Sequence, residues 1–282
     1  MELMRTIILC IALVLGVWSA RADDAAKKEL ASTGKLRAAI AVAPAPGVFF
    51  AIKDKSSGEY RGVTVELARA LAAKVGVGVE FVVYSNSGQI VAAADRGEWD
   101  VTFLPVDEER RKAVVFGNPY CLLQSTYLVA PESSIQSLAD IDRTGIRIVG
   151  VKNTATMRAS AIVSPNASHT AVAGPAESVE LMREGKADAI ATGREALVAM
   201  ATRIPGSRIL DGAFLITTVA IAVPKDKPAA LAFARAFIKD ATSSGQVRRL
   251  FDDFGLHTSI VAPADMEPVP EIIQRPQSTV KN

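Results

Sequence analysis

Short runs of β-forming residues alternate with segments of helical periodicity through most of the chain, and this alternation restricts the fold more than any other feature. The helix expected over residues 63–75 is the clearest, because Leu67, Leu71 and Val75 recur every four residues on one face. Strands are expected over residues 36–42, 79–84, 101–104, 146–151, 170–173, 187–191 and 219–223, and further helices over 90–96, 155–161, 176–183, 228–242 and 245–254. The pattern predicts an α/β protein with covered sheets.

The first residues have the features of a secretory signal peptide. Arg5 precedes an apolar run over residues 7–18, and Ala20-Arg21-Ala22 supplies the small-x-small pattern that signal peptidase reads. The run is shorter than the roughly 20 residues that a membrane-spanning helix needs. We therefore expect residues 1–22 to be removed and the mature protein to be soluble. Either Met1 or Met4 can be the start.

Composition excludes several classes of function. The 32 basic and 30 acidic residues give a net charge of only +2, whereas nucleic-acid binding relies on a strongly basic face. The two histidines are far apart, and Cys121 is the one cysteine outside the expected signal peptide. The chain therefore has too few cysteines and histidines to favour a zinc site, a catalytic Cys/His or Ser/His pair, or an internal disulfide. We expect no nucleic-acid partner, no metal and no cofactor.

An ordered set of short motifs runs along the chain. These are Gly62-Val63-Thr64-Val65-Glu66-Leu67-Ala68, Gly97-Glu98-Trp99-Asp100-Val101, Glu109-Arg110-Arg111-Lys112, Phe116-Gly117-Asn118-Pro119-Tyr120, Val149-Gly150-Val151 and Gly185-Lys186-Ala187-Asp188-Ala189. Together they resemble the family 3 extracellular solute-binding proteins, the periplasmic amino-acid-binding type that serves ABC importers, across residues 34–258.

The resemblance implies a two-lobed periplasmic binding protein fold, with a central mixed sheet in each lobe and two hinge crossings, near residues 127–130 and 216–219. Lobe 1 is expected to comprise residues 23–128 and 218–262, lobe 2 residues 129–217, and a proline-containing tail residues 263–282. The implied protein is a periplasmic monomer that closes over a small-molecule solute by a hinge motion and delivers it to the membrane permease of an ABC transporter.

Arg110 is the strongest candidate for ligand contact. In the family an arginine at this place in the motif holds the ligand's carboxylate, and a planar guanidinium can donate two parallel hydrogen bonds to such a group. The alternative is a solvated arginine, because charged residues crowd around it in the sequence. In the second lobe, Thr154 and Thr156 stand where the family has its Gly-Thr-Thr helix start. Free backbone N–H groups there suit an anion, although Thr154 can simply cap the helix.

Several positions depart from the family pattern. Phe103, Pro105 and Asp107 replace small hydroxyl residues before the arginine, and Asp107 would repel a carboxylate unless it bonds elsewhere or receives a cationic group. Gly193 stands where the family aspartate pairs with the ligand's ammonium group. Arg194 is either a second cation facing the cleft or an exposed residue in the first turn of a helix.

Aromatic and hydroxyl residues complete the predicted ligand contacts. Phe49 and Phe50 follow the first strand, and each can line the cleft or belong to the core. Ser87 can supply a polar contact or simply form a turn.

The ligand is expected to be a small carboxylate-bearing solute, either an amino acid or an organic acid, and a diacid if Arg194 joins Arg110. The alternatives are an enzyme on the same fold, similar to dehydratases of cyclic acids, and a periplasmic sensor that docks on a signalling receptor.

Overall fold

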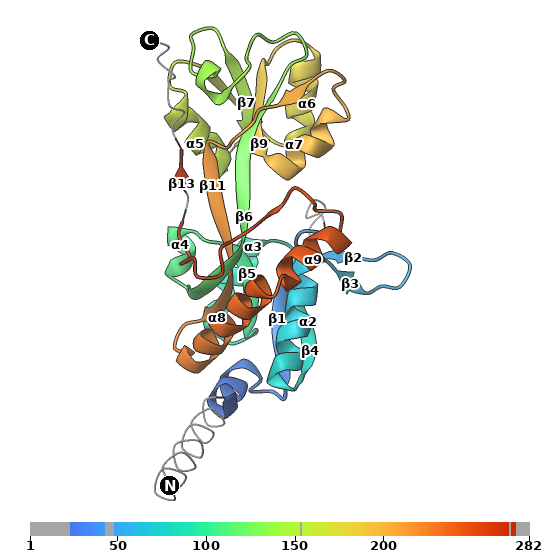
Figure 1. The fold of residues 1–282 in the computed structure, drawn as a ribbon, viewed down its shortest axis with the longest axis vertical. Coiled ribbons are helices and arrows are strands. Elements are labelled where there is room, and N and C mark those ends of the chain that lie inside the picture. The colour runs from blue at the N-terminus through green and yellow to red at the C-terminus, as the bar shows by residue number, and fades with distance from the viewer. Residues whose placement is uncertain (1–22, 43–47, 153, 271, 275–282) are drawn as a thin grey trace, which may run out of the picture. The chain divides into compact units, whose positions relative to one another are not determined.

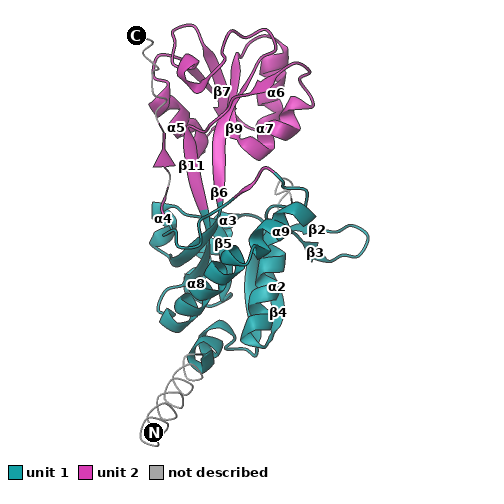
Figure 2. Ribbon diagram, in the orientation of Figure 1, with its two compact units in different colours: residues 1–121, 219–257, 261–268 teal, residues 122–218, 258–260, 269–282 magenta. Residues whose placement is uncertain are grey.

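The computed structural model describes residues 23–42, 48–152, 154–270 and 272–274, so the predicted signal peptide lies outside the described residues. The chain forms two compact units (Figure 2). Unit 1 contains the described residues up to Cys121 together with Val219–His257 and Val261–Pro268. Unit 2 contains Leu122–Thr218, Thr258–Ile260 and the described residues from Val269 onward.

The chain passes between the units inside two strands, β6 (Val114–Val129) and β11 (Leu215–Pro224). The lobe boundaries expected from the sequence, after residue 128 and before residue 218, fall within these same strands. The expected C-terminal tail is divided. Its described part up to Pro268 belongs to unit 1, and Ile272–Ile273 forms a short strand, β13, that pairs with β11 in unit 2.

Unit 1 is built on a mixed sheet in the order β4-β1-β5-β11-β6. β1 (Lys35–Ala41) runs parallel to β4 (Gly78–Tyr84) and to β5 (Val101–Pro105), whereas β11 is antiparallel to β5. The helices of this unit are α2 (Val63–Val75), α3 (Ser87–Ala92), α4 (Glu108–Arg111), α8 (Pro228–Ser243) and α9 (Gln246–Asp253), with the 3-10 turn η1 (Ala94–Arg96) (Figure 1). Residues 23–30 are also helical. Strands β2 (Ile52–Lys53) and β3 (Tyr60–Arg61) form a separate hairpin. β12 (Ile260–Val261) pairs with β6.

Helix α2 shows why the sequence pattern works. Its four-residue repeat buries Leu67 and Leu71 completely, and Gly76 ends it in the left-handed conformation at φ 75°. Gly62 begins it at φ 134°, where a Cβ would lie 2.9 Å from the Val48 carbonyl oxygen. Because no side chain intervenes, the Val63 N–H donates to that oxygen, and the segment before the β2–β3 hairpin is held against the start of α2.

In unit 2 the mixed sheet continues beyond β6. β9 (Ala189–Gly193) and β8 (Ser168–Val172) are both parallel to β7 (Arg147–Val151), and β6 is antiparallel to β9. The other elements are η2 (Leu138–Asp140), α5 (Ala155–Val163), α6 (Pro175–Arg183), α7 (Arg194–Ala201) and β10 (Arg208–Ile209), which pairs with β6. Buried apolar clusters that include Ile148 and Val149, adjacent residues of β7, cover the two faces of this sheet. The predicted α/β class is confirmed. No helix among the described residues is long and apolar enough to cross a membrane.

A polar network lies inside unit 2 around His169. Its Nε2 atom lies 3.3 Å from the Ser160 hydroxyl and 3.2 Å from the Ser164 hydroxyl, and the Tyr127 hydroxyl lies 2.9 Å from that of Ser160. Burial lowers the pKa of His169, and its backbone partners and the charge of Asp142 oppose this shift only in part. The folded protein therefore favours the neutral imidazole.

We expect the stability of unit 2 to fall as pH drops below about 6.5, the ordinary pKa of histidine. In that range the unfolded chain takes up a proton that the folded chain resists, so acid favours unfolding. The measurement is urea unfolding at pH 7.5 and pH 5.5 for the wild type and His169→Asn. The variant should lose part of the pH dependence. Identical pH slopes in the two proteins would contradict the assignment.

Candidate functional site

In unit 1 the candidate site is organised by helix α4. Asp107 precedes this helix in extended conformation, and its carboxylate accepts hydrogen bonds from the backbone N–H groups of Glu109 and Arg110 at 2.8 and 3.2 Å. The side chain is thus a helix cap. Capping accounts for an aspartate beside a predicted carboxylate-binding residue, because its Oδ1 atom accepts both bonds from the start of α4.

The Arg110 side chain is partly buried and held at two points. Its Nη1 donates to the Pro105 carbonyl at 2.9 Å and its Nη2 to the Ser87 hydroxyl at 3.1 Å. Burial lowers the pKa of Arg110, and the charge of Asp107 opposes that shift. No carboxylate among the described residues forms an ion pair with this guanidinium. A desolvated cation with N–H groups to spare is suited to an anionic ligand.

The three predicted phenylalanines belong to one aromatic cluster in unit 1. Phe49 packs on Phe50, Tyr120 and Phe251 at ring distances of 4.9 to 6.2 Å. Phe103 meets Tyr120 edge-on at 5.7 Å. Phe49 and Phe103 are only 7% and 4% exposed, whereas Phe50 is half-buried. Phe50 therefore offers the cluster's most accessible ring of the three.

In unit 2 the predicted threonines lie at the start of α5. Thr154 caps the helix, since its hydroxyl accepts from the Met157 N–H at 3.2 Å and donates to the Val151 carbonyl at 2.8 Å. The Thr156 hydroxyl lies 3.1 Å from that of Ser125 on β6. Thr154 is thus fixed by the helix end, and Thr156 belongs to a hydroxyl pair beside the sheet.

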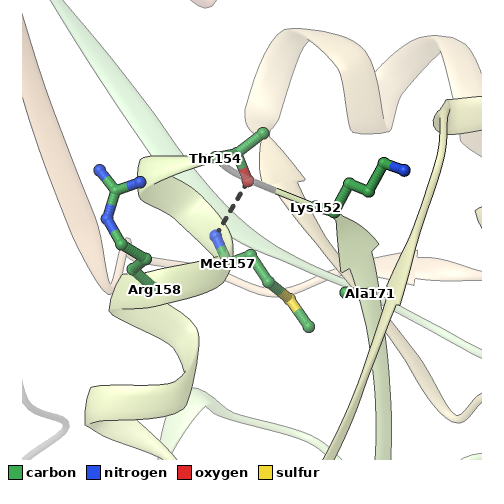
Figure 3. A pocket seen from close by; sticks show the side chains of 5 residues that line it. All are labelled: Lys152, Thr154, Met157, Arg158 and Ala171. Carbon is green, nitrogen blue, oxygen red and sulfur yellow. Dashed lines mark hydrogen bonds between the residues drawn. The ribbon is translucent and has the colours of Figure 1, made fainter.

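A pocket of about 420 Å³ opens beside this helix start, lined by Lys152, Thr154, Met157, Arg158 and Ala171 (Figure 3). Lys152 follows β7, and its backbone N–H donates to the Val172 carbonyl of β8 at 2.9 Å. The pocket wall also depends on Gly150, because a Cβ there would lie 2.8 Å from the Met157 sulfur. Lys152 and Arg158 were not predicted from the sequence. A lysine after a strand carries no motif, and only the pocket makes it notable.

At the end of β9, the charged residues Arg194 and Glu195 have surroundings that the sequence did not indicate. Arg194 donates to the Gln124 side chain at 3.3 Å and to the carbonyls of Leu210 and Gly212 at 3.1 and 2.6 Å. It therefore fastens the loop before β11 to the start of α7. Glu195 was also not predicted. Its carboxylate lies 4.0 Å from where a Cβ of Gly193 would be, and no cation among the described residues pairs with it.

The described part of the chain holds no group of three or more His, Cys, Asp or Glu side chains that could bind a metal ion. Arg110 in unit 1 and the α5 start with Lys152 in unit 2 both favour anions. Two α/β units, each with a mixed sheet and joined by two strands, define the periplasmic binding protein fold.

Comparison with known proteins identifies the family. Residues 40–257 match the bacterial extracellular solute-binding proteins, family 3, and the chain belongs to this family. It is 26% identical over 170 residues to a glutamine-binding protein of Geobacillus stearothermophilus, covering 58% of this chain and 64% of that protein, which is less than two thirds of its length. It is also 26% identical over 208 residues to the ABC transporter glutamine-binding protein GlnH of Bacillus subtilis, covering 72% and 75% of the two chains.

Solved structures agree with this assignment. An ancestral cationic amino acid solute-binding protein superimposes with a TM-score of 0.65 at 26% identity, covering 81% of this chain and 98% of that one. An ancestral amino-acid-binding protein described as a precursor of cyclohexadienyl dehydratase gives a TM-score of 0.62 at 25% identity, with the same coverage.

Proposed function

We propose that this protein is the solute-binding component of an ABC importer and captures a small carboxylate-bearing solute, either an amino acid or an organic acid. The observation that carries the proposal is the state of Arg110. Its guanidinium is desolvated, oriented by Pro105 and Ser87, and without an ion-pair partner among the described residues. A partly buried cation without an ion-pair partner raises the free energy of the folded protein, and a bound carboxylate offsets this desolvation cost.

In this proposal the solute contacts Arg110 of unit 1 and the start of α5 in unit 2 at the same time. Contacts to the second unit exist only in one closed arrangement, so the ligand shifts the population toward it. The two crossing strands act as the hinge. A membrane permease then receives the loaded protein, in line with the name of the Bacillus relative.

The choice between an amino acid and an organic acid depends on the end of β9. The family aspartate is absent at Gly193, which favours an organic acid. Glu195 lies beside that position and lacks a cationic partner among the described residues, which favours a ligand with an ammonium group. The relatives named for glutamine binding support the amino acid.

A catalytic role is the second candidate, because one structural neighbour is described as the precursor of a dehydratase. Such chemistry needs a positioned acid or base. Asp107 caps α4, and Glu109 pairs with Lys112 at 2.7 Å. These contacts favour binding over catalysis. Secretion to the periplasm through the predicted signal peptide is part of the proposal, and docking on a signalling receptor instead of a permease is its nearest alternative.

The test is a thermal-shift screen of the mature protein against amino acids, dicarboxylates and aromatic acids. A ligand that binds only the folded state stabilises it by about 2.7 kcal/mol when present at 100 times its Kd. At least one carboxylate-bearing compound should raise the melting temperature, and mass spectrometry after prolonged incubation should recover it unchanged. Conversion of the compound would establish an enzyme, and the absence of any shift with carboxylates would refute the proposal.

A further inference from the structure

Among the described residues, Ser87 is the one side chain that forms a hydrogen bond with the Arg110 guanidinium. Its hydroxyl accepts from Arg110 Nη2 at 3.1 Å, and the other partner, the Pro105 carbonyl, belongs to the backbone of β5. A guanidinium held by one hydrogen bond can turn its plane about that bond. A second bond from a different element prevents this rotation, so Ser87 and Pro105 together fix the direction in which the remaining N–H groups point.

The backbone around Ser87 is fixed by contacts that do not involve Arg110. Ser87 is the first residue of α3, and the Asn86 side chain caps this helix by accepting from the Gln89 N–H at 3.0 Å. The Gln89 side chain in turn accepts from the Ser85 N–H at 3.0 Å. Two hydrogen bonds therefore close the turn that presents the Ser87 hydroxyl.

Both partners of Arg110 lie next to residues of one buried apolar cluster in unit 1. On the side of Ser87, the cluster contains Ile90 of α3, and the Nε1 atom of the buried Trp99 donates to the Ile90 carbonyl at 3.0 Å. On the side of Pro105, the same cluster contains Val106, the next residue in the chain. Close packing of this cluster holds the Ser87 hydroxyl and the Pro105 carbonyl at a constant separation.

Ser87 also differs from its neighbours in burial. Ser85, Asn86, Gly88 and Gln89 are exposed, whereas Ser87 is half-buried. Serine hydroxyls in turns commonly bond to nearby backbone groups. The Ser87 hydroxyl instead meets a side chain that lies 23 residues further along the chain. Its contact is therefore with Arg110 and not with the local turn.

We propose that Ser87 is a positioning residue of the carboxylate site, whose hydroxyl fixes the plane of the Arg110 guanidinium so that two parallel N–H groups meet a planar carboxylate. The inference rests on the proposed function, because Arg110 is assigned to the carboxylate of the solute. Pro105 and Ser87 occupy only part of the N–H groups of the guanidinium, and the others remain for the solute. A side chain that is already oriented loses less freedom on binding, so the affinity is higher.

The experiment is a double-mutant cycle with Ser87→Ala and Arg110→Ala. Titration calorimetry measures Kd for the tightest-binding of four probes, L-glutamine, L-glutamate, L-lysine and succinate, and another carboxylate from the thermal-shift screen takes their place if none of the four binds. With Arg110 present, Ser87→Ala should weaken binding about three- to tenfold, because the released guanidinium has to be immobilised by the probe. With Arg110→Ala, the same substitution should leave Kd within about twofold, since no guanidinium remains to be held.

Two further variants test whether the hydroxyl itself is responsible. Ser87→Thr keeps a hydroxyl on the same carbon atom and should keep Kd within about twofold of the wild type. Ser85→Ala makes the same change as Ser87→Ala at an exposed serine of the same turn, whose hydroxyl has no hydrogen-bond partner in the described part of the chain, and it should also leave Kd within about twofold. Circular dichroism verifies that each variant is folded.

Failure of the positioning role and failure of the proposed function give different results. If Ser87→Ala binds as tightly as the wild type, or loses the same factor with and without Arg110, the positioning role is overturned, and a wild type that binds a carboxylate keeps the proposed function. A Ser87→Thr variant as weak as Ser87→Ala also overturns the assignment to the hydroxyl. If neither the four probes nor any other carboxylate of the screen binds the wild type, the proposed function itself is refuted.

Discussion

Replacing Arg110 with alanine is expected to weaken binding of any carboxylate solute by at least about 30-fold. Removing one partner of a desolvated, hydrogen-bonded charge pair costs about 2 to 5 kcal/mol, and the lower end of that range corresponds to this factor. The guanidinium is already oriented by the Pro105 carbonyl and the Ser87 hydroxyl. Little reorganisation is therefore needed when a carboxylate arrives, and most of the contact energy contributes to affinity. The measurement is Kd by titration calorimetry with the best hit of the carboxylate screen.

Two variants separate the geometry of this contact from its charge. Arg110→Lys keeps a cation but loses the planar fork, so its affinity should lie between those of the wild type and the alanine variant. Lys112→Ala removes a neighbouring cation that is exposed and paired with Glu109, and it should leave Kd within about twofold. Equal affinities of Arg110→Ala and the wild type would show that the carboxylate is held elsewhere.

The fold could be predicted largely from the sequence where local periodicity and packing agree. The four-residue repeat and the flanking glycines of α2 are local signals, and the helix covers Val63–Val75 as expected. Strand β6 could not be predicted at its full length, because Gly117, Asn118 and Pro119 are typical of a turn. Its extended form depends on neighbours distant in sequence, since β11, β12, β9 and β10 all pair with it.

The candidate site was less predictable than the fold, because it too depends on residues that are distant in sequence. Arg110 and Thr156 stand in motifs that resemble a family, and sequence could single them out. Lys152 and Glu195 are ordinary charged residues at strand and helix ends. Their interest arises from a pocket and from the lack of paired charges nearby, and both depend on the folded chain. Arg194 could be named from the sequence, but its contacts could not, because its two carbonyl partners lie on a loop that no local pattern connects to it.

Loss of Arg37 is expected to destabilise the protein far more than loss of Arg147, although both arginines bind an aspartate in the same way. In each unit an aspartate just before a strand accepts bonds from the backbone N–H, Nε and Nη2 of an arginine on a neighbouring strand, Asp100 from Arg37 and Asp188 from Arg147. Arg37 also donates from Nη1 to the Gly97 carbonyl at 2.6 Å, but the larger difference is the burial of the aspartate. The Asp100 side chain is 1% exposed and that of Asp188 is 26% exposed.

Arg37→Met keeps the aliphatic stem but leaves a buried carboxylate with one backbone donor, and we expect a loss of about 3 kcal/mol in the free energy of unfolding. Arg147→Met leaves a carboxylate that water can reach, so the loss should be about 1 kcal/mol or less. Urea unfolding of both variants at pH 7 measures the difference. Arg37→Met together with Asp100→Asn removes the uncompensated charge and should recover part of the lost stability. Equal losses in the two single variants would mean that the bonds themselves, and not the stranded charge, set the cost.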